Sequence, residues 1–148
     1  MPADPVTIVL AEDDDGHASL VQRNLERAGF VNGFVRVRDG EELLDLIRRG
    51  DAQGTQEFPG MVVLLDINMP RIDGIEALRQ IKANPATQRI PVIMLTTTDD
   101  PREVDRCYEL GCNVYITKPV EYEGFIDAIR RLGMFLQIVR KPRNGREA

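Results

Sequence analysis

The feature of this sequence that most constrains its fold is an uninterrupted apolar run that stops at a single aspartate. The run Met61-Val62-Val63-Leu64-Leu65 is followed directly by Asp66. A short apolar run rich in valine is typical of a strand buried on both faces, as in a parallel sheet. We therefore expect a strand over residues 61–66 with Asp66 at its carboxyl end. Pro70 and the pair Asp73-Gly74 predict a loop before the next helix.

Segments of the same kind recur along the chain and alternate with helical patterns. The expected strands are 6–11, 34–37, 61–66, 92–95 and 114–117. The expected helices are 16–28, 41–49, 72–83, 101–110 and 121–139. Parallel strands that follow each other in this way need right-handed crossovers. The sequence therefore predicts a doubly wound α/β fold, with a five-stranded parallel sheet in the order 2-1-3-4-5 and helices on both faces.

Length and charge exclude several other classes of protein. A chain of 148 residues with a net charge of −5 suits one domain and is not expected to bind nucleic acid. The sequence contains no run long enough to span a membrane and no signal peptide, so a cytoplasmic protein is expected. We predict one domain over 1–148, with a core of about 6–139 and a polar tail at 140–148 that leaves no room for a DNA-binding output domain.

The two cysteines and the single histidine of the chain are not expected to form a functional site. Cys107 and Cys112 lie five residues apart without a histidine nearby, so two reduced thiols on different helix faces are expected instead of a zinc site. His17 is the only histidine of the chain. It falls in the first turn of a predicted helix with no obvious partner, and we expect it at the surface.

Polar side chains gather where the predicted strands end. Glu12 and Asp13 follow the first strand, Asp66 ends the third, Thr96 follows the fourth and Lys118 follows the fifth. Strands 1 and 3 are neighbours in the predicted order, so the three carboxylates share one crevice. Two carboxylates about 5 Å apart repel by roughly 3 kcal/mol at an effective dielectric of 20, so three of them require a cation. Carboxylate oxygens with room for water suit Mg²⁺.

A carboxylate nucleophile, a metal ion, a lysine and a hydroxyl are the parts that phosphoryl transfer needs. In this interpretation the Asp66 carboxylate attacks phosphorus. Mg²⁺ and Lys118 neutralise the equatorial oxygens, and Thr96 donates a hydrogen bond to one of them.

From about Val6 to Val139 the chain resembles the response-regulator receiver domains of two-component signalling. The matching motifs are Leu10-Ala11-Glu12-Asp13, Leu65-Asp66-Ile67-Asn68-Met69-Pro70 with Asp73-Gly74, Leu95-Thr96, and Tyr115-Ile116-Thr117-Lys118-Pro119. The resemblance implies that Asp66 is the phospho-acceptor. It also implies that Glu12 and Asp13 hold Mg²⁺, directly or through water, together with Asp66 and the backbone carbonyl of Asn68.

The same resemblance implies a switch and a partner. Thr96 and Tyr115 form the expected switch pair, Lys118 binds the phosphoryl group, and the bond between Lys118 and Pro119 is expected to be cis. Glu12 departs from the aspartate that many members carry, and its longer arm favours a metal contact through water. Thr97 is bulkier than the residue often found at its position.

The loop at 50–60 and the long last helix resemble the single-domain regulators that are paired with bacterial phytochromes. The expected partner is therefore a sensor histidine kinase, such as a bacteriophytochrome. Met134, Phe135 and Ile138 lie off the apolar stripe of the last helix, which predicts a homodimer through that helix.

Two other functions fit parts of the pattern. A metal-dependent phosphohydrolase would also use an aspartate nucleophile, but Asn68 cannot supply the proton that the second acid of such enzymes provides. Their nucleophile also ends the first strand, whereas Asp66 ends the third. A scaffold with an inactive receiver fold is disfavoured because every reactive position is filled. We therefore expect a signalling switch that assists its own phosphorylation and dephosphorylation and is not an enzyme.

Overall fold

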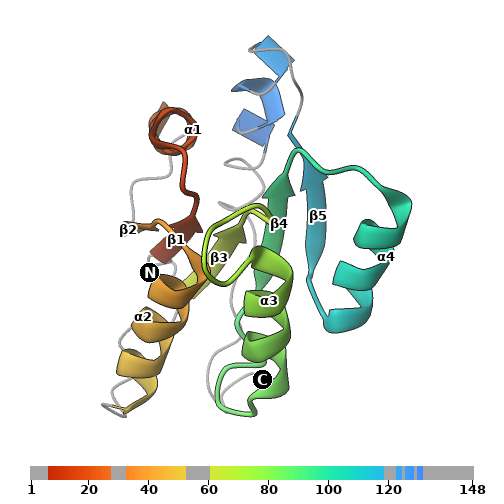
Figure 1. The fold of residues 1–148 in the computed structure, drawn as a ribbon. Coiled ribbons are helices and arrows are strands. Elements are labelled where there is room, and N and C mark those ends of the chain that lie inside the picture. The colour runs from red at the N-terminus through yellow and green to blue at the C-terminus, as the bar shows by residue number, and fades with distance from the viewer. Residues whose placement is uncertain are drawn as a thin grey trace, which may run out of the picture.

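A computed structural model describes most of the chain, and its centre is a parallel sheet (Figure 1). The described residues are 7–27, 33–52, 61–118, 123, 124, 126–128, 130 and 131. The strands are β1 (Thr7–Ala11), β2 (Phe34–Val37), β3 (Met61–Leu65), β4 (Val92–Thr96) and β5 (Val114–Thr117). They pair in parallel in the order β2-β1-β3-β4-β5, which confirms the predicted fold class and strand order.

Helices cover both faces of this sheet, because its strands are apolar on both sides. The helices are α1 (Asp15–Arg27), α2 (Gly40–Ala52), α3 (Gly74–Ala83) and α4 (Pro101–Leu110). Alternate strand residues such as Val63 and Leu65 pack against α2, α3 and α4 in one cluster, and Val62 and Leu64 pack against α1 in the other. Figure 1 shows α2, α3 and α4 side by side along one side of the sheet. The described residues between 123 and 131 are also helical, in agreement with a last helix there.

Two predicted helix boundaries are wrong by two residues or more. The second helix does not end at Gly50 but continues to Ala52, since a glycine costs a helix only about 1 kcal/mol relative to alanine and does not by itself end it. The third helix begins at Gly74 and not at residue 72. There the Asp73 side chain accepts a hydrogen bond from the backbone N–H of Glu76, and this cap fixes the first turn.

The ends of α4 agree with the prediction, and they change the interpretation of the cysteines. Asp100 caps the start, and Gly111 ends the helix in the left-handed conformation at φ 109°. Because the helix ends there, Cys112 is no longer on it, and its N–H donates to the carbonyl of Cys107 over 3.0 Å. Both free thiols are buried in the same core cluster, so the expectation of different faces is wrong. Burial raises the pKa of Cys107 to about 11.

Several expectations concern residues outside the described ranges. These are the conformation of the Lys118–Pro119 bond, the loop beyond Ala52, the apolar stretch 132–139 and the polar tail. They stay predictions. Within the described ranges, no helix combines the length and the apolar character needed to cross a membrane.

Candidate functional site

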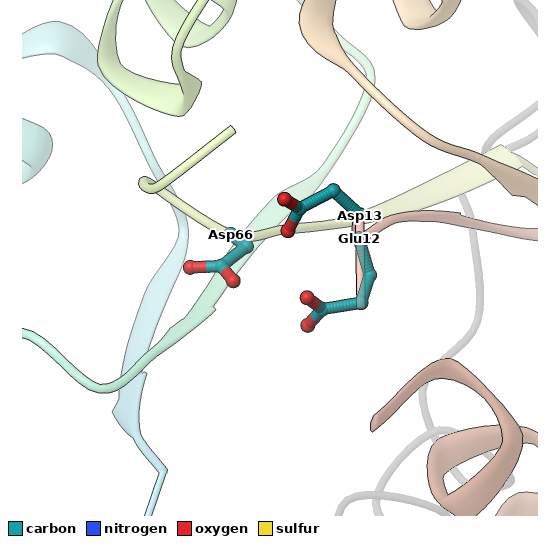
Figure 2. A group of neighbouring side chains, drawn as sticks. All are labelled: Glu12, Asp13 and Asp66. Carbon is teal, nitrogen blue, oxygen red and sulfur yellow. The ribbon is translucent and has the colours of Figure 1, made fainter. Parts of the chain in front are cut away.

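Strand pairing brings the predicted acidic residues together at the carboxyl edge of the sheet. Ala11 of β1 is in register with Leu65 of β3, and the backbone N–H of Asp66 donates to the carbonyl of Ala11 over 3.2 Å. Glu12, Asp13 and Asp66 therefore leave neighbouring strands side by side. Each offers an oxygen that lies within 4.8 Å of the others (Figure 2). This is the crevice that the sequence predicts, and we call these three residues the acidic cluster.

The loop from Asp66 to α3 folds back closely onto the strand end. Gly74 permits this, because a Cβ atom there would lie 2.1 Å from the carbonyl oxygen of Asp66. Its N–H donates to the carbonyl of Ile67 over 2.8 Å. Asn68 is exposed in this loop, and its N–H donates to Oδ1 of Asp66 over 3.3 Å. The loop thus holds the Asp66 carboxylate by a local backbone contact.

A second contact fixes the same loop to the start of α2. Arg71 has a left-handed backbone at φ 66°, and its Nη2 lies 2.6 Å from Oδ2 of the buried Asp39. The neighbouring Gly40 lies so close to the loop that a Cβ atom would come within 2.2 Å of the Ile72 carbonyl oxygen. The pKa of Asp39 is lowered by the backbone N–H of Glu42 and further by the guanidinium. The loop is therefore anchored at both ends.

Lys118 reaches the acidic cluster from the far end of the sheet. The residue follows β5, and its N–H donates to the carbonyl of Thr96 over 2.7 Å. Its side chain is buried, with 4% exposure, and Nζ lies 2.5 Å from Oε1 of Glu12 and 3.3 Å from Oδ2 of Asp66. Burial raises the pKa of Glu12, and the ammonium opposes that rise. The buried cation thus offsets part of the charge of the cluster.

The donor set of the acidic cluster fits a hard divalent cation. Each carboxylate offers an oxygen within 4.8 Å of the other two, and hard oxygen donors grouped this closely suit Mg²⁺, bound directly or through water. Both oxygens of Glu12 accept hydrogen bonds, from Lys118 and from the N–H of Asp14 at 3.2 Å. Both oxygens of Asp66 accept hydrogen bonds as well, from Lys118 and from the N–H of Asn68, each at 3.3 Å. Asp13 is exposed.

The two side chains of the predicted switch pair, Thr96 and Tyr115, differ in burial and in hydrogen bonding. Thr96 is the last residue of β4 instead of following it, and it is 0% exposed. Its Oγ1 has no hydrogen-bond partner among the residues that the structure describes. Tyr115 is half-buried against the core, and its hydroxyl donates to the Thr98 carbonyl over 2.5 Å. Burial raises the pKa of Tyr115 to about 12, so this hydroxyl keeps its proton at neutral pH.

Two residues at the site are not predicted by the sequence, and His17 is the first of them. His17 does not lie apart at the surface; its Nδ1 is 3.3 Å from Nζ of Lys118 and 4.0 Å from Oε1 of Glu12. The side chain is 43% exposed, so the ring lies at the rim of the site. The available signal was the position of the residue: α1 starts directly after Glu12 and Asp13, so its first turn stays close to the same edge.

Arg36 is a second such residue. It lies on β2, next to β1, and its Nε donates to the carbonyl of Glu12 over 2.8 Å. Its Nη1 lies 2.9 Å from Oδ1 of Asp15. Arginine therefore anchors the turn that carries Glu12 and Asp13, as Arg71 anchors the turn that follows Asp66. Neither contact follows from a local sequence pattern.

Comparison with known proteins identifies the family. The sequence matches the response regulator receiver domain over residues 8–130. This chain belongs to the response regulator receiver domain family. Such domains act in two-component signalling, and the residues that carry the family motifs are those that meet at the edge of this sheet.

Solved structures of receiver domains share this fold, and several of them are phytochrome-associated response regulators. A response regulator receiver domain from Rhodospirillum rubrum is 47% identical, with a TM-score of 0.86, and the match covers 97% of this chain and 100% of that one. Rcp1 of Synechocystis, solved with Mn²⁺ bound, is 32% identical with a TM-score of 0.77, over 94% of this chain and all of that one. The phosphorylated cyanobacterial phytochrome response regulator RcpA is 31% identical with a TM-score of 0.79, over 89% and 94%. The resemblance to phytochrome-associated regulators is thus confirmed.

Proposed function

We propose that this receiver domain is a switch controlled by phosphorylation of Asp66, and that a sensor histidine kinase supplies the phosphoryl group. The observation that carries the proposal is the position of the Asp66 carboxylate. It lies between two further carboxylates and a buried ammonium, at the carboxyl edge of the sheet. Asp66 itself is largely buried, with 8% exposure, and follows β3 directly.

The chemistry follows from the charges around Asp66. An oxygen of its carboxylate attacks phosphorus, the bond from phosphorus to the donor nitrogen breaks, and the donor imidazole keeps the electron pair and takes a proton. The product is an acyl phosphate. Negative charge on the three phosphoryl oxygens has to be neutralised during transfer, and the Lys118 ammonium 3.3 Å from Asp66 is placed to contribute to this.

Glu12, Asp13, Asp66 and the backbone carbonyl of Asn68 are the residues that would hold Mg²⁺. When bound, Mg²⁺ supplies positive charge that reduces repulsion between the carboxylates and the incoming phosphoryl oxygens. Support comes from the oxygen ligands of the acidic cluster, and Mn²⁺ is bound in the solved structure of Rcp1. Glu12 acts through water in this account, because its side chain is longer than that of an aspartate at this position.

Thr96 and Tyr115 would report the phosphorylation. A phosphoryl group brings acceptor oxygens to the crevice. The Thr96 hydroxyl, which has no partner among the described residues, is a buried donor at the same sheet edge. A shift of Thr96 toward the phosphate would change the space beside Tyr115, whose hydroxyl is held by the Thr98 carbonyl before phosphorylation. The face formed by α4 and β5 would then carry the signal to other proteins.

The kinase of this pathway is proposed to be a phytochrome, because RcpA is a phytochrome response regulator. A homodimer through the last helix, a cytoplasmic location and a role without nucleic acid complete the proposal. The acidic balance of the chain, with a net charge of −5, supports the last of these.

Asp66→Asn tests the proposal, because an amide is not a nucleophile. Wild-type protein incubated with acetyl phosphate and Mg²⁺ should gain one phosphoryl group by intact mass spectrometry, and Asp66→Asn should gain none. Asp73→Asn is the matched control, since Asn still caps α3 and the residue lies outside the acidic cluster. Labelling of Asp66→Asn at the wild-type rate would place the acceptor elsewhere.

A further inference from the structure

The Lys118 ammonium has a hydrogen-bond partner for each of its three N–H groups. Two are the charged oxygens of Glu12 and Asp66, at 2.5 and 3.3 Å, and the third is Nδ1 of His17 at 3.3 Å. An ammonium only donates hydrogen bonds, so Nδ1 must be the acceptor. The proton of the neutral ring is therefore on Nε2. His17 completes the coordination of a cation that is almost fully buried.

The three contacts of Lys118 differ in strength. The oxygens of Glu12 and Asp66 carry negative charge and attract the ammonium directly, whereas Nδ1 of a neutral His17 ring offers only a lone pair. A phosphoryl group on Asp66 offers anionic oxygens to the same ammonium. The contact to His17 is thus the one that Lys118 loses at least cost.

We propose that His17 is a positioning residue that tethers Lys118 in the resting state and releases it to the phosphoryl group. This inference rests on the proposed function, because the release needs a phosphoryl group on Asp66. In the resting protein His17 keeps the third N–H of a buried ammonium satisfied. In the phosphorylated protein a phosphoryl oxygen takes that N–H, and the ring no longer contributes.

Loss of this tether should have the opposite effect on phosphoryl binding from loss of a residue that supports phosphoryl binding. Removing the Nδ1 acceptor destabilises the resting site but leaves the phosphorylated site unchanged. Loss of the tether must therefore favour the occupied state. A residue that supported phosphoryl binding, in contrast, would weaken binding when removed.

Beryllofluoride, a phosphoryl analogue, allows this difference to be measured with Mg²⁺ present. His17→Leu removes the acceptor at similar size, and His17→Asn keeps an acceptor oxygen near the place of Nδ1. We expect His17→Leu to bind beryllofluoride roughly three- to tenfold more tightly than wild type, as loss of one hydrogen bond from the resting state implies, and His17→Asn to resemble wild type. Gln22→Leu, an exposed position on the same helix, controls for the added apolar group and should not change the affinity.

Unchanged or weaker binding by His17→Leu would overturn the tether, as would an equal gain in His17→Asn or Gln22→Leu. Should His17→Leu fail to fold, nitrogen NMR of the wild-type protein still decides the question, because His17 is the only histidine and gives one set of ring signals. At about pH 8, where a free imidazole is neutral, Nδ1 should be the unprotonated nitrogen. Its signal should shift on Lys118→Met substitution, and an Nδ1–H tautomer or an unshifted signal would contradict the tether.

Failure of the proposed function gives a different result. Wild-type protein would then not bind beryllofluoride at all, although the NMR signature of the contact between His17 and Lys118 would remain. Binding by wild type without any effect of His17→Leu would instead leave the function intact and remove the tether alone.

Discussion

The two sides of the crevice differ in how completely their polar atoms are paired. On the side of β1 and β3, Glu12 and Asp66 both contact Lys118, and Arg36 and Arg71 anchor the turns that carry the acids. Of these side chains, only Nη2 of Arg36 is buried without a partner among the described residues. On the side of β4, the Thr96 hydroxyl is just as buried but lacks a partner in the described part of the chain.

This difference separates two tasks. A side in which the charged groups are already held by hydrogen bonds and the turns are anchored can bind a cation and a phosphoryl group without large rearrangement, so it is suited to the chemistry. A buried donor without a partner is costly, about 1–3 kcal/mol, and gains most when an acceptor arrives. The unpaired hydroxyl is therefore the part of the site that is most sensitive to occupancy.

Loss of an acid from the paired side should have the largest effect. Asp13→Asn removes a charged oxygen ligand from the acidic cluster, and we expect Mg²⁺ affinity to fall by about tenfold or more. Asp14→Asn is the matched control, because Asp14 caps α1 with an oxygen that asparagine retains. Isothermal titration calorimetry measures both, and equal affinities for the two variants would remove Asp13 from the metal site.

Replacing the unpaired Thr96 hydroxyl with an apolar group should stabilise the fold. Thr96→Val removes a buried hydroxyl that has no partner among the described residues, so the free energy of unfolding should rise by about 1 kcal/mol. The same variant should bind beryllofluoride less tightly than wild type, whereas Thr96→Ser, which keeps the hydroxyl, should bind it as tightly as wild type. Urea denaturation checks the stability, and a valine variant less stable than wild type would mean that the hydroxyl is paired in solution.

An effect on stability of similar size but opposite sign is expected at Tyr115. Tyr115→Phe removes the hydrogen bond to the Thr98 carbonyl, and we expect unfolding to become easier by about 0.5–1.5 kcal/mol. Tyr108→Phe removes a hydroxyl that accepts from the Tyr115 N–H, but Tyr108 is about half exposed and water can replace it. Urea denaturation should therefore show a larger loss in the free energy of unfolding for Tyr115→Phe than for Tyr108→Phe. A larger loss for Tyr108→Phe would contradict this prediction.

The sheet could be predicted because its signals are local. Five apolar segments, each ending at a polar residue, give the strands, and their alternation with helices gives the order. Asp66 and Lys118 lie 52 positions apart in the sequence, yet each is the residue that follows its strand, so the edge where they meet follows from the topology. The same reasoning brings Glu12, Asp13 and Thr96 to that edge.

The contacts that tune the site could not be predicted in the same way. Arg71 reaches Asp39 through a left-handed backbone at a residue that is not glycine, and no sequence pattern indicates that conformation. His17 reaches Lys118 across 101 positions, through packing between the first helix and the last strand end. Thr96 gives no sequence signal that its hydroxyl is unpaired. These properties depend on which side chains meet after folding.

Trapping the acyl phosphate tests the central claim most directly. Protein phosphorylated by a purified histidine kinase with Mg²⁺ is reduced with borohydride, which converts an aspartyl phosphate to homoserine, and is then digested and sequenced by mass spectrometry. The account predicts one homoserine, at position 66, and none when Mg²⁺ is removed by chelation before the kinase is added. Modification at Asp13 or at any other residue, or full modification of Asp66 without the metal, would contradict it.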